Sequence, residues 1–226
     1  YGPEQMLLVL SILGLVGYGF LGPIALAILA LLFIVTISYS QVAKVNPGGG
    51  GSYSVAIKNL GEIPALVAAS ALFADYTLTV AVSVSAGTVA IISAFPQFAH
   101  HEVMIDLLVL LGILMIVNLR GVRESSTAFV FPTYAFILGI LMLIISGVYQ
   151  ALTGVAPIIP QESLQRQFDW TMLGLILRAF ANGCSSMTGV EAISNGVPMF
   201  KKPEVKNAQV TTYLMSGLLG LMFLGI

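Results

Sequence analysis

The chain has 226 residues, of which 58% are hydrophobic and only 8% are charged, and its formal net charge is −1. Because an ordinary soluble domain carries about 25% charged residues, this composition argues against a soluble protein and predicts an all-α polytopic membrane protein. The charge also argues against nucleic acid as a partner, since nucleic-acid surfaces need clustered cations.

Seven apolar segments follow one another along the chain, and several approach the length of about 20 residues that a helix needs to span a bilayer. We predict that they form a single transmembrane domain over residues 1–226. The first segment opens with "YGPEQ" and the last stops within an apolar run, so we expect both helices and the domain to be incomplete. The approximate segments are 1–18, 21–42, 64–95, 103–119, 126–153, 173–199 and 206–226.

The connection between the second and third segments contains "NPGGGGSYSVAIKNLGEIP". Its glycine run lacks the Lys-Ser/Thr ending of a phosphate-binding loop, so we interpret it as a flexible loop rather than a nucleotide site. The SYSVAIKNLG portion predicts a short amphipathic helix near the membrane surface. Cations favour the cytoplasmic side, and most of them lie in three loops that alternation places on one side: Lys44, Lys58, Arg120, Arg123, Lys201, Lys202 and Lys206.

The third segment carries Asp75 with about a dozen mostly apolar residues on either side. At this depth a carboxylate costs at least about 2.5 kcal/mol on insertion scales. Thr79 and Ser83 lie about 40° and 80° around the helix from Asp75, so the three side chains form one polar stripe. Their oxygens suit an alkali cation. The alternative is that Asp75 is protonated or bonded to a neighbouring helix while the hydroxyls bond back to helix carbonyls.

The sixth segment contains "ANGCSSMTGVEAISNGVP", in which glycines and hydroxyl residues disfavour a continuous helix and Glu191 adds a charge. We predict a broken helix whose freed carbonyls can coordinate a cation; a continuous helix packed through its small residues is the alternative. Gly2 and Pro3 are typical of a helix start, as in the second half of another broken helix. Two broken helices five segments apart are what an inverted five-helix repeat requires.

The stretches "YGPEQ", "PGGGGSYSVAIKNLG", "DYTLTVAVSVSAG", "NLRGVRES" and "MTGVEAISNGVPMFKKPEVKNA" resemble the amino acid, polyamine and organocation permease superfamily, most closely its KimA-type potassium importers. The resemblance implies a LeuT-type fold with a five-helix inverted repeat. It also implies that the chain runs from the second half of helix one through part of helix seven of that fold.

By the same resemblance, a transported potassium ion is held by Tyr1, Asp75, Thr79, Ser83 and Thr188. Of these, Tyr1 is added by the resemblance alone. Asp75 or Glu191 carries the coupling proton, which the sequence leaves open. The resemblance further implies proton-coupled import by alternating access, a multi-pass location in a bacterial plasma membrane, contact with the lipid bilayer, and a homodimer formed partly through regions outside this chain.

Two other functions remain open from the sequence. The same fold serves proton-coupled amino acid or polyamine permeases, in which amide groups at the helix breaks would hold a substrate carboxylate. A non-transporting membrane sensor or scaffold is the other reading. No nucleophile, base and orienting group occur together, so we predict no enzyme activity and no cofactor beyond the transported potassium ion and the proton.

Overall fold

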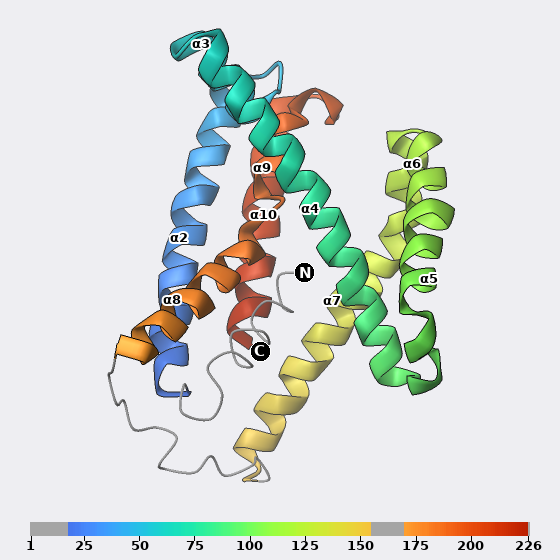
Figure 1. Ribbon diagram of the computed structural model, residues 1–226. Helices are drawn as coiled ribbons and strands as arrows, with labels where there is room; N and C mark the ends of the chain where they lie inside the picture. The colour runs from blue at the N-terminus through green and yellow to red at the C-terminus, as the bar shows by residue number, and fades with distance from the viewer. Residues whose placement is uncertain (1–17, 155–169, 226) are drawn as a thin grey trace. The chain divides into compact units, whose positions relative to one another are not determined.

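The computed structural model describes residues 18–154 and 170–225, and these residues are helices joined by short connections (Figure 1). The described residues divide into two compact units: unit 1 contains residues 18–70, 143–154 and 170–225, and unit 2 contains residues 71–142. Helices α4 (Glu62–Ala94) and α7 (Val122–Leu152) contribute to both units. The elements are α2 (Tyr18–Val45), α3 (Gly51–Asn59), α4 (Glu62–Ala94), η2 (Pro96–His101), α5 (Glu102–Leu107), η3 (Leu108–Met115), α6 (Ile116–Leu119), α7 (Val122–Leu152), α8 (Trp170–Cys184), η5 (Ser185–Met187), α9 (Val190–Asn195), η6 (Val197–Met199) and α10 (Glu204–Gly225).

Five helical stretches within the described ranges are long and apolar enough to cross a membrane. They are Gly19–Val45, Glu62–Ala94, Pro96–Leu119, Thr127–Leu152 and Glu204–Gly225. Each overlaps one predicted segment, whereas the first predicted segment, 1–18, lies almost entirely outside the described residues. The all-α fold class is confirmed. That residues 1–226 form one transport domain stays a prediction.

Unit 1 is organised around α2, which packs against α8, α9 and α10. Three clusters of buried side chains follow one another along α2, and together they hold α8, α9 and α10 against it. The first cluster contains Ile24, Ile28 and Phe223, the second contains Leu32, Met187 and Val190, and the third contains Ala43, Val197 and Ala208.

Polar bonds tie α10 to α2 in addition to this packing. Gln209 donates from Nε2 to the Ser40 carbonyl oxygen at 3.0 Å and to the Ser40 hydroxyl at 3.2 Å. Gly220 of α10 lies against α2, where an added Cβ atom would lie 3.4 Å from Leu29 Cδ2 and 3.6 Å from Leu32 Cδ2; small residues are common where membrane helices pack.

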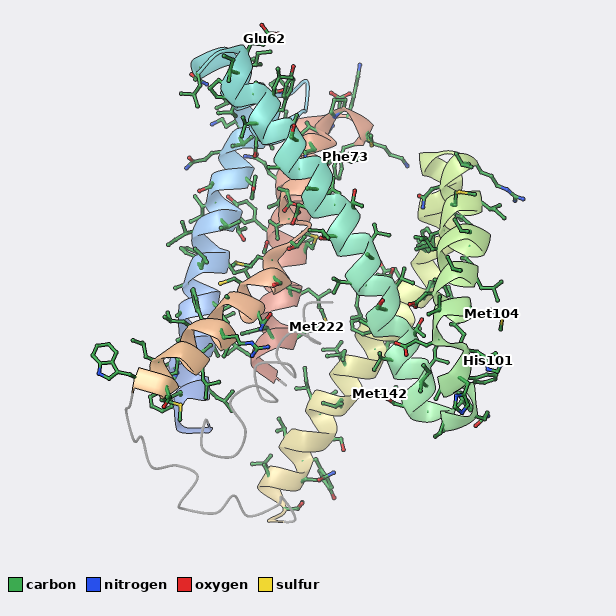
Figure 2. The ribbon with its side chains drawn as sticks, in the orientation of Figure 1. Glu62, Phe73, His101, Met104, Met142 and Met222 are labelled. Carbon is green, nitrogen blue, oxygen red and sulfur yellow. The ribbon has the colours of Figure 1, made fainter. Side chains whose placement is uncertain are left out.

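Unit 2 is a hairpin of α4 and the helical stretch 96–119, followed by most of α7. The stretch 108–115 forms a π-helix within the predicted segment 103–119, so this segment is not a uniform α-helix. Large apolar side chains such as Phe73, Met104 and Met142 project outward and are more than half exposed (Figure 2). Such surfaces match lipid or other helices rather than water.

Candidate functional site

The sixth predicted segment is interrupted, as the sequence predicts. Helix α8 ends at Cys184, one 3₁₀ turn follows over Ser185–Met187, and Thr188 is extended with φ −59° and ψ 133°. Gly189 then takes φ 99°, a left-handed conformation that favours glycine. The chain resumes as α9 at Val190, so the break is made by residues whose chemistry opposes a continuous helix.

The break is packed against the middle of α2. Met187 is 9% exposed and Val190 is fully buried, and both contact Leu32 in the second cluster. Cys184, which is half-buried, packs against the same cluster. Irregular backbone at membrane depth is tolerated where protein covers it, and α2 provides that cover.

Glu191 lies in the first turn of α9 and is 8% exposed. Its two carboxylate oxygens accept hydrogen bonds from the Gly189 N–H at 3.1 and 3.2 Å. Ser194 donates from its hydroxyl to the Glu191 carbonyl oxygen at 2.7 Å. The carboxylate therefore caps its own helix, and this arrangement places a buried titratable group directly at the break.

Thr188 occupies the extended position between the two helical parts and is half-buried. Its N–H donates to the Ser185 carbonyl at 3.1 Å. Its hydroxyl has no hydrogen-bond partner among the described residues.

Three of the predicted site residues lie on α4 within unit 2. Asp75 and Ser83 are exposed and Thr79 is half-buried. Other hydroxyls of this helix bond back to carbonyls four residues earlier, as Thr77 does to Phe73 at 2.8 Å. Within the described ranges, Asp75, Thr79 and Ser83 make no hydrogen bond or ion pair. The alternative in which these two hydroxyls bond back to the helix is thus not what the structure contains.

Thr79 and Ser83 line a groove of about 400 Å³ in unit 2. Thr88 adds a third hydroxyl residue, and Val84 and Val109 are among the apolar side chains that form the walls. Asp75 is not among the lining residues and lies one turn before Thr79 on α4. The groove is largely apolar, and Thr79 and Ser83 supply it with hydroxyl oxygens, which are neutral groups of the kind that coordinate cations.

Sequence reasoning missed Asp106, a carboxylate inside the apolar stretch "MIDLLVLLGILM". Asp106 lies on α5 and is half-buried. Thr88, which is 1% exposed, donates to it at 2.5 Å, and Ser85 donates at 3.4 Å. The position of Asp106 within an apolar membrane segment could have marked it as a candidate functional or structural residue, because carboxylates are rare there. Here it fastens α5 to α4 beside the groove.

The predicted site residues divide between the two units. Thr188 and Glu191 belong to unit 1, whereas Asp75, Thr79 and Ser83 belong to unit 2. Tyr1 lies outside the described residues. Thr188 and Glu191 are brought together at one break, and Thr79 and Ser83 are brought together in one groove; that the two sets form one site stays a prediction.

These features define a polytopic helical protein with an interrupted helical segment, and the chain belongs to the amino acid permease family, which residues 6–226 match. The predicted membership of the permease superfamily is confirmed. The family match, together with the five long apolar helices of the described ranges, makes this a multi-pass plasma-membrane protein of the amino acid permease family.

The chain is 43% identical over 227 residues to a protein of Bacillus subtilis (strain 168) named potassium transporter KimA. The similarity covers 100% of this chain and 37% of the Bacillus protein, so the chain spans little more than a third of that relative's length. The resemblance to the KimA-type branch is confirmed by this identity.

Proposed function

We propose that the protein is a secondary active potassium importer, working as a potassium/proton symporter by alternating access in the plasma membrane of a bacterium. The ion is held by oxygens of Asp75, Thr79, Ser83 and Thr188, with Tyr1 as a further ligand. The observation that carries this proposal is that the side-chain oxygens of Asp75, Thr79 and Ser83 make no internal bonds within the described ranges, although neighbouring Thr77 does. The identity to a named potassium transporter supports the choice of ion.

Each part of the proposed site has a chemical task. Asp75 supplies negative charge that offsets the loss of the ion's hydration, and the hydroxyls supply neutral oxygen ligands. Glu191 or Asp75 carries the proton. Glu191 suits this task because it is buried at the break and because its protonation would weaken the two bonds from the Gly189 N–H. Binding of the coupling proton by Glu191 would then change the geometry of the helix break.

The second candidate is a proton-coupled amino acid or polyamine permease, which the family description favours. In that reading the free amides at the helix breaks bind a substrate carboxylate. At the break before α9, however, the Gly189 N–H already donates to Glu191. This occupied amide favours the cation reading for the part of the site that the structure describes.

Uptake of rubidium or potassium into proteoliposomes tests the proposal, with full-length protein and an imposed inward proton gradient. We expect gradient-driven uptake in the parent, its loss in Asp75→Asn, and a raised half-saturating rubidium concentration in Thr79→Val. Thr77→Val is the matched control, because it removes a hydroxyl that bonds back to its own helix on the opposite face. We expect it to transport like the parent.

Potassium uptake by Asp75→Asn equal to that of the parent would contradict the proposed ion site. Saturable uptake of a labelled amino acid that is indifferent to potassium would select the permease reading instead. A folded parent with no flux of either substrate class would favour the sensor or scaffold. We also propose that the protein contacts the lipid bilayer and forms a homodimer. Crosslinking in membranes tests whether the homodimer forms.

A further inference from the structure

The glycine run between α2 and α3 docks on the C-terminal end of α9. Gly50 donates its N–H to the Asn195 carbonyl oxygen at 3.1 Å. Gly51 is buried, and α3 contacts α9. The expected flexible loop is therefore fixed against an element about 145 residues further along the chain.

The contact is so close that a Cβ atom at Gly49 would collide with the backbone of Asn195, and a Cβ atom at Gly51 would have to displace the Asn195 side chain. A Cβ atom at Gly49 would lie 2.5 Å from the Asn195 carbonyl oxygen and 2.9 Å from Pro198 Cδ. A Cβ at Gly51 would overlap Asn195 Oδ1 and lie 3.0 Å from the Ser194 hydroxyl. By contrast, a Cβ at Gly48 would meet nothing within 4 Å. The glycine run thus has a specific docking face rather than general flexibility.

The loop is itself fixed to the elements on both sides of it. Gly49 donates to the carbonyl oxygen of Asn46, which is 3% exposed, at 3.0 Å. Ser54 of α3 donates its hydroxyl to the Gly49 carbonyl at 2.8 Å. Lys58 donates from Nζ to Asn46 Oδ1 at 2.6 Å. Residues 46–58, which we call the loop clamp, therefore act as one unit against α9.

Helix α9 is short enough to transmit a displacement along its whole length. It contains six residues, with Asn195 at one end and Glu191 one turn away, about 6 Å along the axis. Val190, at its other end, packs on Leu32 beside the break. A shift imposed at Asn195 therefore reaches the capping carboxylate and the extended Thr188.

We propose that the loop clamp is a positioning element for the helix break, holding α9 so that Glu191 and Thr188 keep the geometry that transport needs. The effect on transport rests on the proposed function, whereas the effect on α9 does not. In this proposal the loop clamp acts on Glu191 and Thr188 indirectly, through its contact with Asn195.

The first test compares three alanine variants of the full-length protein. Gly51→Ala introduces the overlap with the Asn195 side chain, whereas Gly49→Ala, used in the second test below, introduces the overlap with the Asn195 backbone. Gly48→Ala adds a methyl group in the same run without a contact. Gly61→Ala places alanine at φ 93° with nothing within 4 Å, and so reproduces left-handed strain without the close approach. Thermal unfolding in detergent shows that each variant is folded.

Two readouts separate the clamp from the proposed function. The first is the rate at which a membrane-permeant maleimide alkylates Cys184, with other cysteines of the full-length protein replaced, because Cys184 is covered by the cluster that includes Val190 of α9. The second is the half-saturating rubidium concentration for uptake. We expect Gly51→Ala to raise both by about 2- to 30-fold, the range typical of a mutation that acts through an intervening element. Gly48→Ala and Gly61→Ala should match the parent.

A second-site variant distinguishes positioning from a general loss of stability. Asn195→Ala removes the Oδ1 and Cγ atoms that a Cβ at residue 51 would meet, so it should restore Gly51→Ala toward the Asn195→Ala single variant. It should not restore Gly49→Ala, whose Cβ would meet the backbone oxygen of Asn195 and the Pro198 ring. A variant that was merely unstable would show no such selectivity.

Two results would contradict the proposal that the loop clamp positions α9. One is a parent-like alkylation rate and parent-like uptake in Gly51→Ala. The other is equal rescue of Gly49→Ala and Gly51→Ala by Asn195→Ala. If the parent transports no potassium but Gly51→Ala alone raises the alkylation rate of Cys184, the positioning role of the loop clamp is supported and the proposed function is contradicted.

Discussion

Thr88→Val tests whether the Thr88–Asp106 bond fastens the hairpin of unit 2. The substitution keeps the branched shape of the side chain and removes only the hydroxyl that donates to Asp106 at 2.5 Å. Thr88 is 1% exposed, so water cannot take the place of the lost donor. Asp106 would keep the weaker contact from Ser85 at 3.4 Å.

The expected magnitude follows from the geometry. Side-chain hydrogen bonds between membrane helices average about 0.6 kcal/mol and reach about 1.7 kcal/mol. The short distance and the burial of the donor place this bond near the upper value, so we expect Thr88→Val to lower the free energy of unfolding by about 1.5 kcal/mol. That corresponds to a roughly tenfold change in the unfolding equilibrium.

A double-mutant cycle in mixed micelles, followed by reversible denaturant unfolding, measures the bond itself. Thr88→Val and Asp106→Leu are combined, and we expect a coupling energy of about 1 kcal/mol or more. Ser85→Ala is the matched control on the same helix and should cost less than about 0.5 kcal/mol, because its contact is long and exposed. A coupling energy below about 0.3 kcal/mol would show that the hairpin does not depend on this bond.

Two further predictions concern unit 1. Ser216 is 6% exposed and its hydroxyl has no partner among the described residues, so Ser216→Ala should raise the free energy of unfolding by up to about 1 kcal/mol; a lower midpoint in a thermal scan would contradict this. Glu191→Gln keeps one oxygen to accept from the Gly189 N–H but cannot titrate, so the variant should fold and bind rubidium while its uptake loses its dependence on the imposed proton gradient. Unchanged gradient dependence would remove Glu191 as the proton carrier.

Local chemistry predicted much of this fold. The apolar runs are long because lipid offers no hydrogen-bond partners to the backbone, so length and composition indicate each membrane helix without any knowledge of its neighbours. The break after Cys184 was predictable for a similar reason. Gly189 takes a left-handed conformation, and the run of small and hydroxyl residues before it gains little from a helix. The short helix α3 was also readable from its own residues.

The candidate site was predictable in part. The 100° rotation per residue of an α-helix predicts that Asp75, Thr79 and Ser83 lie on one stripe. In the structure, Thr79 and Ser83 line one groove. Sequence reasoning could not tell whether those hydroxyls bond back to the helix, because Thr77 does so and Thr79 does not, although both are threonines in the same helix. That difference depends on side-chain rotamers, which residue type does not determine.

The contacts between distant segments were decided by tertiary structure alone. The sequence by itself determined that the chain is a multi-pass helical membrane protein with an interrupted sixth segment, because each of those properties is set within one run of residues. Only the tertiary structure paired Asp106 with Thr88 and docked the glycine run on Asn195. A carboxylate or a glycine signals an unusual environment, but the atom that meets it comes from another element, and the packing of the elements chooses that atom.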